Sequence, residues 1–361
     1  MTKTVLLSAG GTGGHLFPAH ALAQELVERG VKVHLATDER AERFAAEFPA
    51  SEIHIIRSAT FRGRSPIALM RTFTHLLQGY LQSRKLMSQI KPHAVVGFGG
   101  YPTVPPLLAA SHKGVPTILH EQNAIMGRAN RFLASRVTAI ASGFPIQNQD
   151  GLAGAALTVS GNPLRELAHN AANRPYVAAQ LDDPFHLLVF GGSQGARFFS
   201  DILPEALAEL ERTERDRLTV TLQARPEDAE RTRTALLQLE VESEVNDFYR
   251  DMPDRISRSH LVICRSGASS VSELALIGRP SLLVPLPGAL DDDQGANAAG
   301  LAAAGGATMI RQRELTPKKL AKMLSDAMKD PESLAIQAEN AKKAGVPDAA
   351  PRLADLVHLH I

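Results

Sequence analysis

Two glycine-rich segments, one in each half of the chain, are suited by composition to bind an anion. The sequence GGTGGH at residues 10–15 follows the apolar run 4–8, and GGSQGA at residues 191–196 follows the apolar run 186–190. A strand that ends in glycines and continues as a helix directs backbone N–H groups and the positive end of the helix dipole toward an anion. The repeat predicts two phosphate-facing lobes with a cleft between them.

The first glycine segment differs from the common nucleotide-binding loops. Leu16 stands where a dinucleotide fingerprint starting at Gly11 requires its third small residue, and no Lys-Ser/Thr pair follows as in a P-loop. His15 lies at the expected start of a helix, where the dipole disfavours an imidazolium cation. We interpret His15 as a neutral base or a substrate contact. The alternative is a tight turn that needs glycine only for its backbone conformation.

A serine-rich segment follows the apolar run 261–264. Residues 265–273 read RSGASSVSE, in which Ser270 and Glu273 have the spacing of a capping box. The other hydroxyl and N–H groups suit a diphosphate, and a carboxylate one turn into the helix can accept hydrogen bonds from a ribose diol. We expect a nucleoside diphosphate here rather than capping alone.

Other polar residues lie in loops that follow strands of the first half. Loops 97–102 and 120–123 end strands at the same sheet edge as residues 10–15, where open α/β sheets bind ligands. Glu121 or Asn123 can equally cap the next helix. Arg165 can neutralise a leaving phosphate, or it is an ordinary surface arginine.

Metal-ligand patterns are missing from the sequence. It contains no CxxC, HExxH or clustered-histidine pattern, and Asp291–Asp293 has no second carboxylate group at ligand spacing. Successive side chains point in different directions, so we read the three aspartates as a solvated loop. We predict no tightly held metal and no cofactor.

Composition narrows the class of protein. With 361 residues, 44% of them hydrophobic, the chain is long enough for two domains with separate cores. The net charge of +1, from 39 basic and 38 acidic residues, gives no global basic field, so we expect no nucleic-acid partner. The single cysteine, Cys264, is expected in a core and cannot form an internal disulfide, which suits the cytosol. We expect neither a signal peptide nor a membrane-spanning segment.

The hydrophobic pattern alternates between short strands and amphipathic helices. Apolar runs begin near residues 4, 31, 53, 94, 117 and 137, and again near 186, 218, 245, 261, 281 and 307. This alternation predicts a doubly wound parallel sheet in each half. We place an N-terminal domain at 1–160 and a C-terminal domain at 161–345. Residues 346–361, with a helix at 351–358, can pack back on the N-terminal domain.

A long amphipathic helix is predicted after Ser65 and Pro66. Its apolar face runs from Ile67 to Leu81 and is bordered by arginines rather than acidic residues. Most such helices cover a core, but a wide apolar face with a basic rim also suits an anionic bilayer surface. Both interpretations fit this pattern.

Six motifs in this order span nearly the whole chain. They are GGTGGH at 10–15, GGY at 99–101, HEQN at 120–123, GNPLR at 161–165, GGSQGA at 191–196 and RSGA at 265–268. Together they closely resemble the MurG family of bacterial transferases, which add N-acetylglucosamine (GlcNAc) to undecaprenyl-diphosphoryl-muramoyl-pentapeptide, turning lipid I into lipid II. The resemblance implies a GT-B fold, with two Rossmann-like domains facing a cleft. It also implies UDP-GlcNAc as donor and peripheral attachment at the cytoplasmic face of the cell membrane.

The resemblance also implies roles for particular residues. Tyr249 stands where the family packs an apolar side chain on uracil, so the residue type departs from the pattern. Further departures are Ser269-Ser270, where threonine is common, and Asp293, where His or Gln often precedes the matching Gln. The implied contacts are Ser269, Ser270 and Glu273 on the UDP diphosphate and ribose; Ser193 and Arg165 on phosphate; Gln294 and Asn297 beside the donor sugar; and Thr12, Gly13, Gly14 and Asn123 on the facing wall.

Both the residues and the resemblance indicate an inverting, single-displacement glycosyl transfer. The muramoyl 4-hydroxyl attacks the anomeric carbon, His15 accepts the proton, and UDP leaves toward a helix N-terminus and an arginine. Glu121 is the alternative base. Two other functions stay open: a UDP-GlcNAc 2-epimerase, which would turn over the donor without acceptor, and a non-catalytic nucleotide-sugar binding protein.

Overall fold

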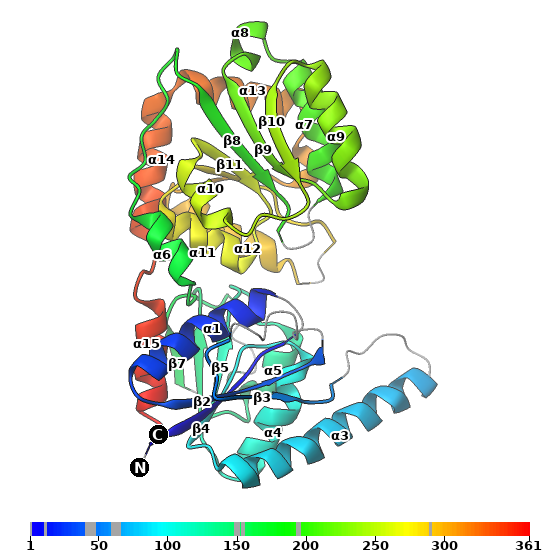
Figure 1. Ribbon diagram of the computed structural model, residues 1–361, viewed down its shortest axis with the longest axis vertical. Helices are drawn as coiled ribbons and strands as arrows, with labels where there is room; N and C mark the ends of the chain where they lie inside the picture. The colour runs from blue at the N-terminus through cyan, green and yellow to red at the C-terminus, as the bar shows by residue number, and fades with distance from the viewer. Residues whose placement is uncertain are drawn as a thin grey trace. The chain divides into compact units, whose positions relative to one another are not determined.

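The chain was analysed as a computed structural model that describes residues 2–10, 13–39, 48–58, 66–147, 152, 156–192, 196–288 and 291–361. The side chains of residues 66–69, 71 and 72 are outside this description, as are Thr12, Ser65 and Ser193. Contacts divide the chain into two compact units. Unit 1 comprises Met1–Arg165 together with Asp348–Ile361, and unit 2 comprises Glu166–Pro347 (Figure 1).

Unit 1 is built on a parallel sheet with the strand order β3-β2-β1-β4-β5-β6-β7. The order turns around at β1, because β2 pairs with one side of β1 and β4 with the other. In such sheets the loops after the two central strands diverge and leave a crevice at the carboxyl edge. The strands are β1 Thr4–Ser8, β2 Lys32–Thr37, β3 Glu52–Ile55, β4 Ala94–Gly97, β5 Thr117–Glu121, β6 Ala139–Ser142 and β7 Ala156–Val159.

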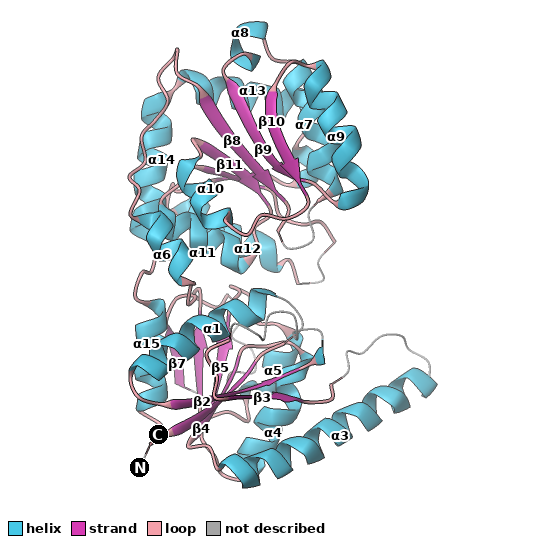
Figure 2. Ribbon diagram, in the orientation of Figure 1, coloured by secondary structure: helices cyan, strands magenta, loops and turns pink. Residues whose placement is uncertain are grey.

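Helices cover both faces of this sheet (Figure 2). Side chains alternate along each strand, so Val5 and Leu7 enter one core while Leu6 enters the other. The core of Val5 and Leu7 is closed by α1 (Gly13–Glu28) and α15 (Ala349–His358). The core of Leu6 is closed by α3 (Pro66–Ile90), α4 (Val104–His112) and α5 (Arg128–Ala134), with η2 (Tyr101–Thr103) leading into α4.

The last helix, α15, is held in unit 1 by apolar packing and by an arginine. Leu353, Ala354 and Val357 are buried in the same core as α1. Arg29 on α1 forms an ion pair with Asp355 at 2.6 Å, and it donates a hydrogen bond to the carbonyl of Pro351 at 3.3 Å. The C-terminal segment is therefore part of the unit 1 core.

Unit 2 contains a second parallel sheet, with the order β10-β9-β8-β11-β12-β13. Its strands are β8 Phe185–Phe190, β9 Leu218–Gln223, β10 Glu242–Asn246, β11 Leu261–Cys264, β12 Ser281–Leu283 and β13 Thr308–Met309. Its helices are α6 Glu166–Ala172, α7 Arg197–Ala208, α8 Arg212–Arg215, α9 Pro226–Gln238, α10 Met252–Arg258, α11 Ala268–Ile277, α12 Asp293–Ala303, η3 Gln312–Glu314, α13 Pro317–Lys329 and α14 Pro331–Ala344.

The α/β class with two doubly wound parallel sheets is confirmed. Cys264 is fully buried in β11, as expected, and burial raises the pKa of its thiol. One strand was missed: β7 lies between the apolar runs near residues 137 and 186, where no strand was expected. Its residues are mostly exposed at the sheet edge, so they lack the apolar run that marks the central strands. Among the described residues no helix combines the length and apolar character needed to cross a bilayer.

Candidate active site

The glycines of unit 1 allow two loops to meet at the carboxyl edge of the sheet. A Cβ on Gly10, after β1, would lie 2.9 Å from Cγ of Pro102 in the loop after β4. Gly99 and Gly100 have φ of +84° and +77°, the left-handed region that favours glycine. A larger residue at Gly10 would push these loops apart. Glycine is therefore required at residue 10 by packing and favoured at residues 99 and 100 by the backbone conformation.

His15 lies in the first turn of α1, and its ring is oriented by Gln122. Nδ1 of His15 is 3.1 Å from Oε1 of Gln122. The amide of Gln122 has a defined orientation, because its Nε2 lies 2.8 Å from the backbone carbonyl of Phe98, which can only accept. Oε1 therefore faces His15, and Nδ1 of His15 must carry the proton. In the neutral ring this leaves Nε2 of His15 as a proton acceptor.

The acceptor nitrogen of His15 lies beside a glycine. A Cβ on Gly100 would be 3.6 Å from Nε2 of His15. The absence of a side chain at residue 100 keeps that edge of the ring from being covered by this loop. The position and tautomer of His15 suit a general base that receives a proton from a bound hydroxyl.

His120 extends this network into the core of unit 1. It is completely buried, and its Nε2 lies 3.1 Å from the carbonyl of Gly161, to which it donates. Its Nδ1 accepts from Nε2 of Gln122 at 3.3 Å. Burial lowers the pKa of His120 to about 4, so it is neutral near pH 7. The neutral ring supports the amide orientation of Gln122.

Glu121 organises the loop after β5. Its Oε1 accepts from the backbone N–H of Asn123 at 2.9 Å and from the Asn123 side chain at 3.2 Å. Its Oε2 accepts from the N–H of Gly127 at 2.9 Å and from Nδ2 of Asn130 at 2.8 Å. The carboxylate is only 2% exposed. This arrangement disfavours Glu121 as the base, because both oxygens already hold the loop that carries Asn123.

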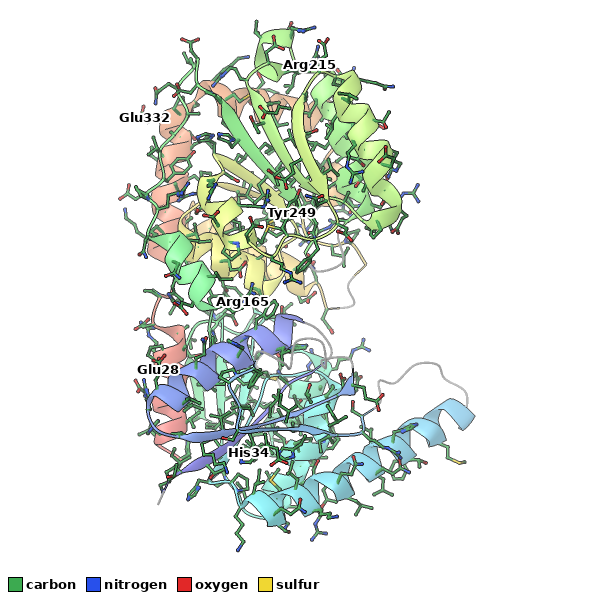
Figure 3. The ribbon with its side chains drawn as sticks, in the orientation of Figure 1. Glu28, His34, Arg165, Arg215, Tyr249 and Glu332 are labelled. Atoms are coloured by element: carbon green, nitrogen blue, oxygen red, sulfur yellow. The ribbon has the colours of Figure 1, made fainter. Side chains whose placement is uncertain are left out.

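Arg165 is the last residue of unit 1. Its guanidinium lies over the ring of Phe17 on α1, 3.9 Å from the ring centroid. Its Nε is buried without a hydrogen-bond partner among the described residues. Figure 3 labels Arg165 near α1. Gly13 is buried and packs against Phe17, whereas Gly14 is exposed at the start of the helix. Within the described part of the chain, the cation is thus placed by aromatic packing and forms no ion pair.

In unit 2, α11 begins earlier than the sequence analysis expected. Its N-cap residue is Gly267, with extended backbone and no capping side chain, and the helix starts at Ala268. The expected capping box of Ser270 and Glu273 is therefore wrong, because both residues lie inside the helix. With Gly267 as the N-cap residue, the helix boundary lies upstream of Ser270. The first N–H groups of α11, including those of Ser269 and Ser270, have no intrahelical acceptor and suit an anion.

A buried arginine lies just before this helix. Arg265 donates to the carbonyls of Val284 and Pro285 at 3.0 and 3.1 Å and to Oε1 of Gln312 at 2.6 Å. Burial lowers its pKa to about 10, so it keeps its charge near pH 7. The hydrogen bonds that it donates among the described residues all go to neutral acceptors. Arg265 therefore adds positive potential beside α11, a contribution that the sequence analysis did not assign.

The residues expected beside the donor sugar lie at the start of α12. Asn297 is buried and donates to the carbonyl of Ser266 at 3.2 Å, and the hydroxyl of Ser266 donates to the carbonyl of Gln294 at 2.8 Å. Oε1 of Gln294 accepts from the N–H of Leu286 at 3.0 Å. These contacts join α12 to the loop before α11. Asn297 therefore positions the two helix starts, and Gln294 is half-buried between them.

One aspartate before α12 forms an ion pair. Asp292 forms a bidentate pair with Arg311 at 2.6 and 2.7 Å. The Arg311 guanidinium lowers the pKa of Asp292. Asp292 is about half exposed, but Asp293 is the first residue of α12, so the loop expected for Asp291–Asp293 ends at Asp292.

Tyr249, the expected uracil contact, is packed inside unit 2. It is 6% exposed, its hydroxyl lies 3.0 Å from the carbonyl of Glu244, and the Arg255 guanidinium lies 4.1 Å from its ring centroid (Figure 3). Burial raises its pKa to about 12. The neighbouring Phe248 is 56% exposed. An aromatic surface next to β10 is therefore provided by Phe248, which the sequence analysis did not single out.

Comparison with known proteins places this geometry in a family. Residues 5–142 match the glycosyltransferase family 28 N-terminal domain, and residues 186–353 match the glycosyltransferase family 28 C-terminal domain. The chain belongs to glycosyltransferase family 28. The sites around His15 and α11 thus lie one in each domain of the family.

Full-length relatives agree with this assignment. A Brucella abortus (strain S19) UDP-N-acetylglucosamine--N-acetylmuramyl-(pentapeptide) pyrophosphoryl-undecaprenol N-acetylglucosamine transferase is 58% identical over 352 residues, covering 98% of this chain and 93% of the relative. The crystal structure of Acinetobacter baumannii MurG has a TM-score of 0.79 and 31% identity, covering 99% of both chains. A Neisseria meningitidis UDP-GlcNAc 2-epimerase has a TM-score of 0.69 at 14% identity, covering 99% of this chain and all of the epimerase, and shows a shared fold alone. The family 28 relatives confirm the expected GT-B fold and the resemblance to MurG.

Proposed function

We propose that this chain transfers GlcNAc from UDP-GlcNAc to the muramoyl 4-hydroxyl of undecaprenyl-diphospho-MurNAc-pentapeptide, with inversion at the anomeric carbon. Relatives with 58% identity over nearly the whole chain carry the name of this transferase. The structural observation that carries the proposal is the hydrogen bond from His15 to Gln122, which leaves Nε2 of His15 as acceptor. An enzyme that activates a hydroxyl needs such a base.

The reaction is a single displacement. The acceptor oxygen bonds to the anomeric carbon while its proton passes to Nε2 of His15. The bond from the anomeric carbon to the diphosphate oxygen breaks, and its electron pair leaves with UDP. The N–H groups at the start of α11 and the charge of Arg265 stabilise the developing negative charge, because preorganised donors need little reorganisation during the reaction.

The proposed contacts to the donor and the acceptor lie in both units. In unit 2, Ser269, Ser270 and Glu273 on α11 bind the UDP diphosphate and ribose, Gln294 contacts the sugar, and Phe248 provides the aromatic surface for uracil. Asn297 and Tyr249 act mainly through packing and hydrogen bonds. In unit 1, Gly13, Gly14 and Asn123 border the acceptor, and Arg165 binds a phosphate of the leaving UDP. Thr12 and Ser193 keep their proposed contacts but lie outside the described residues.

We also propose that α3 attaches the protein peripherally to the cytoplasmic face of the cell membrane. Met70, Phe73, Leu77 and Leu81 are exposed at spacings of three or four residues, so they form one stripe. The basic residues Arg84 and Lys85 are exposed in the next turn. Figure 1 shows the N-terminal half of α3 extending past the other helices of unit 1. An apolar stripe beside basic residues suits an anionic lipid surface.

The activity is tested with labelled UDP-GlcNAc and a short-chain lipid I analogue, each incubated with and without the other. Acceptor-dependent transfer of label with release of UDP supports the proposal. Release of UDP or isomerisation of the sugar without acceptor would instead indicate an epimerase. Binding of the donor with no turnover under either condition would indicate a non-catalytic nucleotide-sugar binding protein.

A further inference from the structure

Two histidines and a glutamate come together at the edge of the unit 1 sheet, outside the proposed active site. His34 is on β2, and Glu52 and His54 are on the edge strand β3. The parallel register pairs His34 with Glu52 and Ala36 with His54. Side chains two residues apart share a face, so all three project to the side of the sheet that also carries Ala36. Figure 3 labels His34 on this part of unit 1.

Three donor atoms of these side chains form a compact triangle. Nδ1 of His34 lies 3.1 Å from Nε2 of His54, and Oε2 of Glu52 lies 3.9 Å from the first nitrogen and 3.8 Å from the second. A circle through three atoms with these separations has a radius of about 2.1 Å, which is the length of a Zn–N or Zn–O bond. The two nitrogens share a hydrogen bond, so one of them carries a proton; an ion near the centre would take the place of that proton as the ring changes tautomer.

Burial prepares the two imidazoles to act as ligands. The side chains of His34 and His54 are 5% and 15% exposed, whereas Glu52 is 63% exposed. Burial lowers the pKa of both histidines, and a metal ligand must be unprotonated. Glu52 supplies a negative charge from the solvent side. The histidine side of the cluster is buried and the Glu52 side is open to solvent, so water can act as a fourth ligand.

We propose that His34, Glu52 and His54 form a binding site for a divalent transition metal, Zn²⁺ in the first place, with water completing a tetrahedron. Two imidazoles and one carboxylate are a donor set that zinc accepts in proteins. The ion would join the edge strand β3 to β2 across the connection from residue 38 to residue 51. No metal was predicted from the sequence, because known ligand motifs hold their residues close together in the chain, whereas strand pairing brings His34 and His54 together across twenty residues.

One neighbouring charge opposes the ion. Lys32 lies on the same face of β2, is exposed, and lowers the pKa of His34 through its charge. Its ammonium would repel Zn²⁺ in the same way. Lys32→Gln should therefore tighten zinc binding, whereas loss of a ligand should weaken it. Opposite effects from two positions around one centre are not expected of adventitious binding to scattered histidines.

The test uses the untagged full-length chain, stripped with a chelator and titrated with ZnCl₂ by calorimetry. We expect one equivalent of zinc to bind. His54→Gln and Glu52→Gln should each weaken binding at least about tenfold, since loss of even an outer-shell partner costs about 10–100-fold in metal affinity. Glu52→Gln changes an exposed side chain, so it tests the site even if His54→Gln fails to fold. His358→Gln, at an exposed position on α15, is the control and should bind like the parent.

Cobalt gives a second measurement that does not depend on activity. Co²⁺ in a tetrahedral site has intense visible absorption, which we expect in the parent protein and in His358→Gln but not in His54→Gln. Zinc should also raise the melting temperature of the parent, because a ligand that binds the folded state stabilises it. Equal zinc affinity in the parent, His54→Gln and Glu52→Gln would overturn the proposal, as would the absence of stoichiometric binding in the parent.

Discussion

Nδ1 of His15 lies 3.1 Å from Oε1 of Gln122, and this contact defines which nitrogen of the imidazole is protonated. The definition holds because Nε2 of Gln122 lies against the carbonyl of Phe98 and beside Nδ1 of His120. A base must present its lone pair to the substrate in the correct tautomer. In this protein the tautomer is therefore set by Gln122, in the loop after β5, and by the residues that orient it, not by α1, which carries the histidine.

Single substitutions of His15 and Gln122 should separate the effect on the chemical step from the effect on donor binding. His15→Ala should lower kcat by about 10²–10⁴-fold, the usual contribution of a general base, with little change in UDP-GlcNAc affinity. Gln122→Leu should lower kcat by a smaller factor, because the base remains but its tautomer is no longer defined. Steady-state kinetics and calorimetry with UDP-GlcNAc measure the two quantities. Equal losses of kcat and donor affinity in His15→Ala would assign the residue to binding.

Glu121 should prove to be structural. Glu121→Gln places an amide where the carboxylate accepts from backbone and side-chain N–H groups, so at least one buried donor loses its acceptor. We expect the free energy of unfolding to fall by about 1–3 kcal/mol, measured by urea denaturation. Activity per folded molecule should stay within a few-fold of the parent. Loss of more than about a hundredfold in kcat without loss of stability would instead identify Glu121 as the base.

Phe248 and Tyr249 should respond differently to substitution. Phe248→Ala removes an exposed ring, so it should weaken UDP binding with little effect on the melting temperature. Tyr249→Phe removes a buried hydroxyl that contacts the carbonyl of Glu244 and should cost about 1 kcal/mol of stability with little effect on UDP affinity. Thermal unfolding and UDP titration of both variants make the comparison. If instead Tyr249→Phe weakens UDP binding and Phe248→Ala does not, Tyr249 would be the contact to the uracil ring.

The apolar stripe of α3 should bind vesicles. The double variant Met70→Ser/Phe73→Ser should co-sediment less with vesicles of phosphatidylglycerol and phosphatidylcholine than the parent. Leu237→Ser, which changes an equally exposed apolar residue on α9, is the matched control and should bind like the parent. Binding should weaken at high salt, because basic residues contribute to it. If all three proteins sediment alike, α3 is not the attachment site.

Stability should depend on pH through His120. Its pKa is about 4 in the folded protein and near 6.5 when exposed, so below about pH 6.5 the unfolded state binds a proton that the folded state does not. The free energy of unfolding should therefore fall as the pH drops from about 6.5 toward 4. His260, with a folded pKa of about 4, contributes in the same direction. Urea denaturation of His120→Gln should show a weaker dependence on pH over this range than the parent.

The sequence revealed the central strands and the family, but not the contacts between side chains. Central strands such as β1 and β11 are continuous apolar runs because both of their faces are buried, and that signal is local. The exposed edge strand β7 lacks it. The start of α11 was placed wrongly because Ser270 and Glu273 have capping spacing, while the N-cap residue is Gly267. Residue spacing alone cannot tell at which of several adjacent residues the helix begins.

Contacts between residues on different strands or loops could also not be predicted from local sequence patterns. The motif at 120–123 drew attention to Glu121 and Asn123, yet the role of Gln122 depends on a carbonyl in a different loop. Similarly, His34 and His54 meet only because β2 and β3 pair in a particular register. Such contacts follow from the tertiary structure, and pairing the predicted strands in register would be the first sequence-based signal of them.

The packing of α15 on α1 has a consequence for the order in which the chain can fold. Ribosomes release a chain from its N-terminus, so residues 166–347 emerge before Leu353 and Val357, which complete a core begun by Val5 and Leu7. Unit 1, most of which is synthesised before unit 2, can therefore complete its core only after α15 has been made, whereas unit 2 has all of its residues before α15. A nascent chain that stops before residue 349 would hold a finished second unit and a first unit with an open apolar face.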